Sequence, residues 1–108
     1  MSEFDELLLI VEKLRVECPW DKEQTHESLA KHLIEESYEL IDAISKLDAT
    51  QESFDELKGE LGDVLLQIFL HSKIAEEKEF FNMSDVMKSL REKLIKRHPH
   101  IFEDKQLE

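Results

Sequence analysis

The sequence predicts an all-α fold, because residues that form turns are scarce and apolar residues recur at helical spacing. The 108 residues include only two glycines and two prolines, which leaves few positions for the tight turns that connect strands. The length supports one domain, spanning residues 1–108. A domain this small buries a limited share of its surface, so a dimer is a natural way to enlarge its core.

The spacing of apolar and capping residues predicts four helices. They run from Ser2 to Glu17, from Thr25 to about Leu47, from Ser53 to about Lys78, and from Ser84 to just before Pro99. We expect a loop at residues 18–21, a turn at residues 79–83, and a short, mostly polar tail over residues 100–108. The third helix is apolar almost all round from Leu61 to Leu70, so it should be the most buried element.

Several apolar residues belong either to the core or to a dimer interface, and the sequence does not separate the two. They are Leu65, Ile68, Phe69, Val86 and Leu90. His26, His32 and His71 are interpreted as ordinary helix histidines.

The net charge and the cysteine content limit which kinds of partner and which cellular compartments are expected for this protein. The formal net charge of −12 argues against a nucleic-acid polymer, because a phosphate backbone is bound by basic surfaces. A nucleotide stays compatible, since a metal ion can reverse the local sign of an acidic site. Cys18 is the only cysteine, which excludes an internal disulfide and favours a reducing compartment. With no recognisable signal peptide or long apolar run, we expect a cytoplasmic protein without a membrane partner.

Two short acidic motifs lie within segments that otherwise have the spacing of core helices. Glu36 takes a position in the second helix where an apolar residue is expected, and Glu60 interrupts the stripe of the third. Glu39 and Asp63 each follow three residues later, and Glu35 lies four before Glu39, so the carboxylates project from neighbouring turns. Carboxylates at such positions are costly unless a cation meets them.

Carboxylates on two facing helices favour a divalent metal ion. Like charges held close together persist only if some are protonated or a cation neutralises them. The candidate ligands are hard oxygen donors, which favours Mg²⁺, with Mn²⁺ as a substitute, over zinc. An acidic magnesium site with open coordination positions suits polyphosphate substrates. The alternative is that Glu35, Glu39 and Glu60 lie on solvated helix faces.

Both glycines of the chain, Gly59 and Gly62, lie beside Glu60. Each costs about 1 kcal/mol in a helix interior relative to alanine. We expect the compensation to be close approach, either of a neighbouring helix or of the phosphates of a ligand.

The acidic pattern Glu35-Glu36-x-x-Glu39 followed by Glu60-x-x-Asp63 resembles that of the MazG nucleoside triphosphate pyrophosphohydrolases. Three further segments resemble the same family, and the similarity covers nearly the entire chain in the right order. Residues 18–25 are similar to the loop before the family's first metal helix, residues 59–65 to its second metal helix, and residues 97–102 to the segment that closes the domain.

The resemblance implies a four-helix all-α bundle that forms a homodimer, and it leaves a tetramer open. It also implies hydrolysis of nucleoside triphosphates to nucleoside monophosphates and pyrophosphate, in a role that cleans the nucleotide pool. Carried over by position, the metal ligands are Glu36, Glu39, Glu60 and Asp63. Glu35 is then a candidate for a second metal or for orienting the attacking water, and its alternative is a plain surface residue.

Protein cations are expected to face the remaining phosphates of the substrate. The resemblance places Lys93, Lys96 and Arg97 near the triphosphate, and the alternative is that they are favourable charges at a helix C-terminus. Lys58 is a weaker candidate. Trp20 can stack on a base or pack against the first helix.

A second function class competes with an enzyme. Relatives often carry two copies of this domain, and this chain resembles the first, N-terminal copy. The alternative function is therefore a non-catalytic helical dimerisation or regulatory domain of a longer two-domain protein. All four acidic residues of the family pattern are present in this chain, which favours the hypothesis of an active enzyme.

Overall fold

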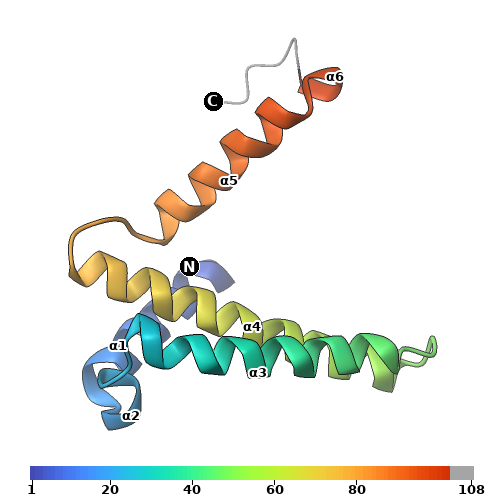
Figure 1. Cartoon of the computed structure of the whole chain (residues 1–108), viewed down its shortest axis with the longest axis horizontal. Coiled ribbons are helices and arrows are strands. Elements are labelled where there is room, and N and C mark those ends of the chain that lie inside the picture. Colours follow the sequence, from blue (N-terminus) through green and yellow to red (C-terminus); the bar gives the residue numbers. More distant parts are fainter. Residues whose placement is uncertain (103–108) are drawn as a thin grey trace.

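The computed structural model describes residues 1–102, and every regular element in that range is a helix (Figure 1). The elements are α1 (Glu3–Glu17), α2 (Pro19–Lys22), α3 (His26–Ser45), α4 (Gln51–Glu77), α5 (Met83–Arg97) and α6 (Pro99–Phe102). The all-α prediction is confirmed for these residues, and residues 103–108 of the predicted tail lie outside the described range. Within that range, no helix has the length and hydropathy needed to cross a bilayer.

Side-chain caps set where α1 and α3 begin, as predicted. Ser2 accepts a hydrogen bond from the amide of Asp5 at 3.1 Å, and Thr25 accepts one from the amide of Ser28 at 3.0 Å. In each case the third helical residue bonds back to the cap, so two otherwise unpaired amides are satisfied reciprocally.

The caps of α4 and α5 lie before the predicted serines, so those two predictions were wrong. Thr50 caps α4 by accepting a hydrogen bond from the amide of Ser53 at 3.2 Å, and Asn82 caps α5 by accepting one from Asp85 at 3.0 Å. Ser53 instead lies inside α4 and donates its hydroxyl to the carbonyl of Thr50 at 3.0 Å. Threonine and asparagine both cap helices well, so the helices extend back to them.

Two segments outside the four predicted helices form single helical turns. α2 begins at Pro19 and α6 at Pro99, and proline suits the first helical position because its fixed φ matches a helix and its missing N–H is not needed there. The loop predicted for residues 18–21 is therefore wrong beyond Cys18. The first residues of the predicted tail, from His100 to Phe102, belong to α6.

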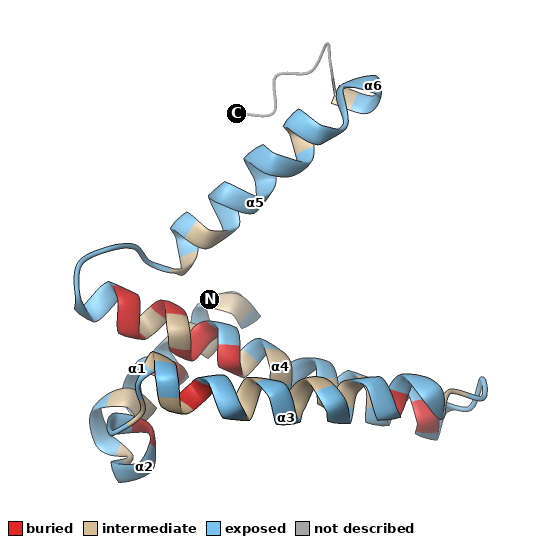
Figure 2. Ribbon diagram, viewed as in Figure 1, coloured by how far each residue is buried: buried red, intermediate tan, exposed pale blue. Residues whose placement is uncertain are grey.

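The core forms where α1 and the start of α3 meet the second half of α4. Its buried apolar residues are Val11, Leu29, Phe69, Leu70 and Ile74. The rings of Phe4 and Phe69 pack with centroids 5.8 Å apart. Figure 2 shows most of the buried positions in this part of the molecule, a smaller group at the far end of α3 and α4, and all of α5 less covered.

As predicted, α4 carries more buried residues than any other described helix, and they are concentrated in its second half. Most of them fall between Gln67 and Ala75, whereas Leu61, Leu65 and Ile68 are 51%, 39% and 40% exposed. Phe69 belongs to the core, and the prediction that this helix is the most buried element is confirmed for the described residues.

The two glycines do not mark a close helix contact within this chain. A Cβ placed on Gly59 or Gly62 would have no neighbouring atom within 4 Å. The predicted close approach of a neighbouring helix is therefore wrong for the described chain, and approach of a ligand stays a prediction.

α3 and α4 lie side by side and antiparallel, whereas α5 diverges from them (Figure 1). The turn after α4 passes through Glu79 at a φ of 64°, and the amide of Phe80 bonds to the carbonyl of Ala75 at 3.0 Å, which ends the helix sharply. α5 then contacts only α4 and α6 among the described helices, and none of its residues is buried.

Candidate metal centre

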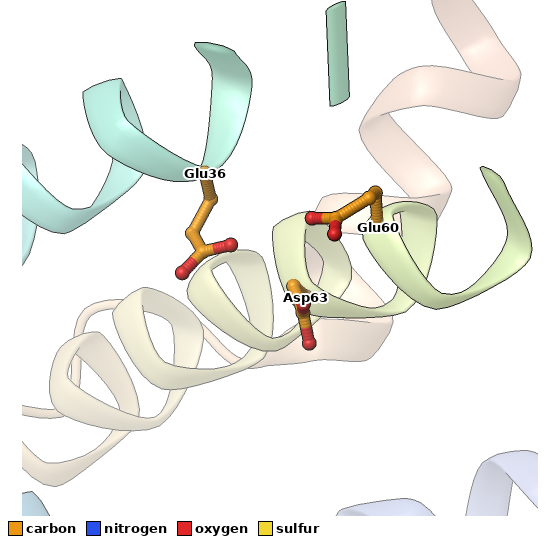
Figure 3. A group of neighbouring side chains, drawn as sticks. All are labelled: Glu36, Glu60 and Asp63. Carbon is orange, nitrogen blue, oxygen red and sulfur yellow. The ribbon is translucent and has the colours of Figure 1, made fainter. Parts of the chain in front are cut away.

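Three carboxylates converge between α3 and α4. Glu36 comes from α3, and Glu60 and Asp63 come from successive turns of α4, with one oxygen of each lying within 4.8 Å of the others. Figure 3 shows Glu36 and Glu60 pointing toward one another across the two helices, with Asp63 on the next turn. In the described part of the chain this is the one group of three or more possible ligands that lie so close.

The helix pairing explains how residues from two distant motifs meet. Glu60 and Asp63 are three residues apart, so they share one side of α4. The antiparallel α3 brings Glu36 opposite them, and both Glu36 and Glu60 are half-buried. The interruption of the apolar stripes at these two positions therefore corresponds to a real inward placement of both side chains.

Glu60 is the residue of this group whose charge is least compensated. Its Oε1 is buried and has no hydrogen-bond partner. Desolvation raises the pKa of Glu60, and the negative charges of Asp63, Glu39 and Glu36 raise it further. A buried, unpartnered carboxylate oxygen among like charges is what a bound cation would satisfy. The residues therefore fit a divalent metal ion with hard oxygen ligands.

Glu39 and Glu35 lie at the edge of the group rather than in it. Glu39 is exposed one turn after Glu36, and its charge reaches Glu60, although its oxygens do not join the three that converge. Oε1 of Glu35 lies 3.7 Å from Nδ1 of His32, and the Glu35 side chain is largely exposed.

Trp20 lies beside the start of this acidic surface. Its ring meets that of His32 edge-on, with centroids 5.2 Å apart, and it is 49% exposed. His32 lies four residues before Glu36 on α3, so the two share one side of the helix. The exposed face of Trp20 is therefore available about one turn from the carboxylates.

The cationic residues predicted for the site do not reach the carboxylates within this chain. Lys58 is 80% exposed and pairs with Asp55 at 3.5 Å. Lys93, Lys96 and Arg97 lie in the second half of α5, which has no contact with α3. The single chain thus gathers the acidic side of the predicted site without its basic side.

Sequence reasoning missed the hydrogen-bond network around Arg15, and no local pattern in the chain indicates it. Its Nε and Nη2 donate to the carboxylate of Glu77 at 2.8 and 3.0 Å. Its Nη1 donates to the carbonyls of Asp21, Lys22 and Gln24 at 2.6, 3.2 and 3.0 Å. One guanidinium therefore joins α1, α4 and the segment that carries Trp20.

Two of the histidines form a pair that sequence reasoning missed. Nδ1 of His26 and Nδ1 of His71 are 2.7 Å apart, and the rings stack with centroids at 4.9 Å. Desolvation lowers the pKa of His71, and the neighbouring His26 lowers it further. This pair fastens the first turn of α3 to α4. Between it and the acidic group, Gln67 is 5% exposed and its Oε1 has no partner.

Comparisons with known proteins agree with the fold and with the family that the sequence resembles. The MazG nucleotide pyrophosphohydrolase domain matches residues 24–102, and the chain belongs to this family. It is 53% identical over 103 residues to the nucleoside triphosphate pyrophosphohydrolase/pyrophosphatase MazG of Thermotoga maritima, covering 94% of this chain and 38% of the relative. It is 42% identical over 111 residues to a nucleoside triphosphate pyrophosphohydrolase of Escherichia coli, covering 100% of this chain and 40% of the relative.

A solved structure supports the same fold. The crystal structure of a mazG-related protein from Thermotoga maritima aligns with a TM-score of 0.75 and 25% identity, covering 96% of this chain and 87% of that one. The chain spans about two fifths or less of the length of the curated relatives named above.

Proposed function

We propose that this chain hydrolyses nucleoside triphosphates to nucleoside monophosphates and pyrophosphate with the help of a divalent metal ion. The observation that carries the proposal is the convergence of Glu36, Glu60 and Asp63, with a buried oxygen of Glu60 left unpartnered. Membership of a family of nucleotide pyrophosphohydrolases supplies the substrate class.

Glu36, Glu60 and Asp63 would hold the ion, and Glu39 would complete the set from the next turn of α3. Mg²⁺ is the ion we favour and Mn²⁺ its substitute, because all four ligands are carboxylates. When bound, such an ion would neutralise negative charge on the α-phosphate and would lower the pKa of a coordinated water.

The chain's own residues would position the water and the substrate. Glu35 lies beside the ligands, and His32 at 3.7 Å can orient its carboxylate, so we assign to Glu35 the placement or deprotonation of the attacking water. Trp20 offers an exposed ring face for the base. Lys58 is exposed two residues before Glu60, and reaching the phosphates would require it to leave Asp55.

The dimer is part of this proposal. Ile34, Tyr38 and Ile41 form an exposed apolar stripe on α3, turned away from Glu36, and α4 exposes Leu61, Leu65 and Ile68. Covering these surfaces with the same helices of a second copy would complete a four-helix bundle from α3 and α4 of each chain. Two such dimers could pair into a tetramer. A cytoplasmic location remains the expectation from sequence.

The test is product analysis with each nucleoside triphosphate in Mg²⁺ and in Mn²⁺. We expect monophosphate and pyrophosphate, abolished by a chelator and by Glu36→Gln. Glu27→Gln, an exposed acid in the first turn of α3, is the matched control and should keep activity. Absence of turnover in either metal would favour the non-catalytic dimerisation domain, and release of orthophosphate would show that a different bond is cleaved.

A further inference from the structure

Two buried side-chain atoms of residues 1–102 lack a hydrogen-bond partner, and both belong to α4. They are Oε1 of Glu60 and Oε1 of Gln67, three residues before and four residues after Asp63. Figure 3 shows Glu60 and Asp63 on successive turns of α4. A buried polar atom that stays unpaired is costly, so native proteins rarely keep one that no ligand or water satisfies. Two such atoms on either side of a candidate metal ligand therefore point to one site.

Gln67 lies on the side of α4 that faces α3. Four residues before it, Asp63 converges with Glu36 of α3. Four residues after it, His71 contacts His26 of α3 at 2.7 Å. Residues four apart share one side of a helix, so the side chain of Gln67 enters the same seam between the two helices. It is 5% exposed there, whereas the carboxylates are half-buried or exposed.

Helix geometry directs the side chain of Gln67 toward the acidic group. Side chains of a helix tilt toward its N-terminus, and Asp63 lies on that side of Gln67 at an axial rise of about 6 Å. Oxygens that share one magnesium ion lie within about 4 Å of one another, because each is about 2.1 Å from the ion. A hydrogen bond from a coordinated water reaches about 2.8 Å further. A residue one turn beyond the ligands is therefore within reach of such a water.

The partner of Gln67 must be a donor, because an amide oxygen only accepts hydrogen bonds. The phosphates of a nucleotide are acceptors and do not satisfy it. The nucleoside carries donors, but its proposed seat at Trp20 is 49% exposed, whereas Gln67 is buried in the seam. A water coordinated to a divalent ion is small and is a strong donor, since the ion draws charge from it. Mg²⁺ usually keeps several waters when protein carboxylates bind it.

We propose that Gln67 is a positioning residue of the metal centre. Its Oε1 accepts a hydrogen bond from a water coordinated at the group of Glu36, Glu60 and Asp63, and this bond fixes the orientation of the water. The inference rests on the proposed function, in which such a water attacks the α-phosphorus. Orienting the attacking water lowers the barrier to reaction and leaves the binding of the nucleotide nearly unchanged. Loss of Gln67 should therefore lower kcat more than it raises KM.

Replacing Gln67 by methionine tests the unpartnered oxygen without any metal. Methionine has a similar length and lacks the acceptor, so in chelator Gln67→Met should raise the melting temperature by about 4–8 °C. Ser72→Ala is the matched control, because Ser72 is also buried in α4 but donates its hydroxyl to the carbonyl of Ile68 at 2.9 Å. Its melting temperature should equal that of wild type or fall below it. A lower melting temperature in Gln67→Met would show that the oxygen has a partner within the protein, and would overturn the proposal.

Binding of Mn²⁺ tests the contact with the metal centre apart from turnover. Replacing residues that support a ligand sphere typically weakens metal affinity by about 10- to 100-fold. A Mn²⁺ titration followed by electron paramagnetic resonance should therefore show about tenfold weaker binding in Gln67→Met and unchanged binding in Ser72→Ala. Gln67→Glu keeps an acceptor at the same place and should bind Mn²⁺ at least as tightly as wild type. Wild-type affinity in Gln67→Met, or equal weakening in Gln67→Glu, would contradict the proposal.

Kinetics at saturating Mg²⁺ separates this inference from the proposed function. Gln67→Met should lower kcat by about tenfold or more with a nearly unchanged KM for the nucleotide, and Ser72→Ala should keep both. A raised KM with unchanged kcat would assign Gln67 to nucleotide binding and would refute the contact with water. If the wild-type protein does not turn over, the melting and Mn²⁺ results still decide the role of Gln67. If wild type and Gln67→Met hydrolyse the nucleotide with equal kcat, the proposed function stands and this inference is wrong.

Discussion

Replacing Arg15 by methionine would remove the guanidinium that joins α1, α4 and the Trp20 segment, while keeping much of the aliphatic stem. The side chain is 13% exposed and makes five hydrogen bonds. Two of these go to Glu77, and three go to backbone carbonyls beside α2. The carbonyls are the more important part, because they hold the turn that presents Trp20.

The magnitude follows from how exposed each partner is. Glu77 is 42% exposed, so its ion pair is worth at most about 1 kcal/mol. A hydrogen bond to a charged group contributes about 1.5–3 kcal/mol, and since one nitrogen serves all three carbonyls we count them as one such bond. The expected loss for Arg15→Met is then about 3 kcal/mol, or a fall in melting temperature of roughly 12–24 °C.

The assay is thermal unfolding followed by circular dichroism and by fluorescence, in which Trp20 is the only tryptophan. Glu77→Gln is the matched control, and it should cost less than about 1 kcal/mol because it removes only the ion pair. In Arg15→Met, the fluorescence of Trp20 should change at temperatures where the helices are still folded. Equal losses for the two variants would refute the importance assigned to the carbonyl contacts.

Three further predictions concern single side chains. Because the folded state raises the pKa of Glu60, the metal-free protein should lose stability as the pH rises above the ordinary pKa of a glutamate. In the presence of a chelator, Glu60→Gln should therefore have a higher melting temperature than wild type at pH 8 but not at pH 4. Because the folded state lowers the pKa of His71, the free energy of unfolding should be highest above about pH 6.5 and should decrease as the pH falls below it. Equilibrium unfolding of His71→Phe should show a smaller decrease. Ala49 has a φ of 71°, so Ala49→Gly should raise stability by about 0.5–1 kcal/mol in urea unfolding, and a loss would contradict the strain.

The long helices were predictable because their signals are local. Ser2 and Thr25 cap helices through residues three positions away, and Pro19 ends the first helix at its neighbour. The caps Thr50 and Asn82 were missed because serines a few residues later offered the same chemistry. Sequence could not say which of two adequate caps would be used.

The candidate site was predictable only where side chains face each other along one helix pair. The interrupted stripes singled out Glu36 and Glu60, and both are half-buried and close to Asp63. The cations on α5 followed from family resemblance. Their distance from the acids depends on the direction in which the predicted turn at residues 79–83 sends α5, and the sequence does not reveal that direction. Arg15 was missed for a similar reason, since its partners lie up to 62 residues away.

Hydrolysis in ¹⁸O-labelled water tests the central claim most directly. With Mg²⁺ and a nucleoside triphosphate, water held near Glu36, Glu60 and Asp63 should attack the α-phosphorus, so mass spectrometry should find the label in the monophosphate and none in the pyrophosphate. Asp63→Asn should give neither product. Label in pyrophosphate, release of orthophosphate, or full activity in Asp63→Asn would contradict the account.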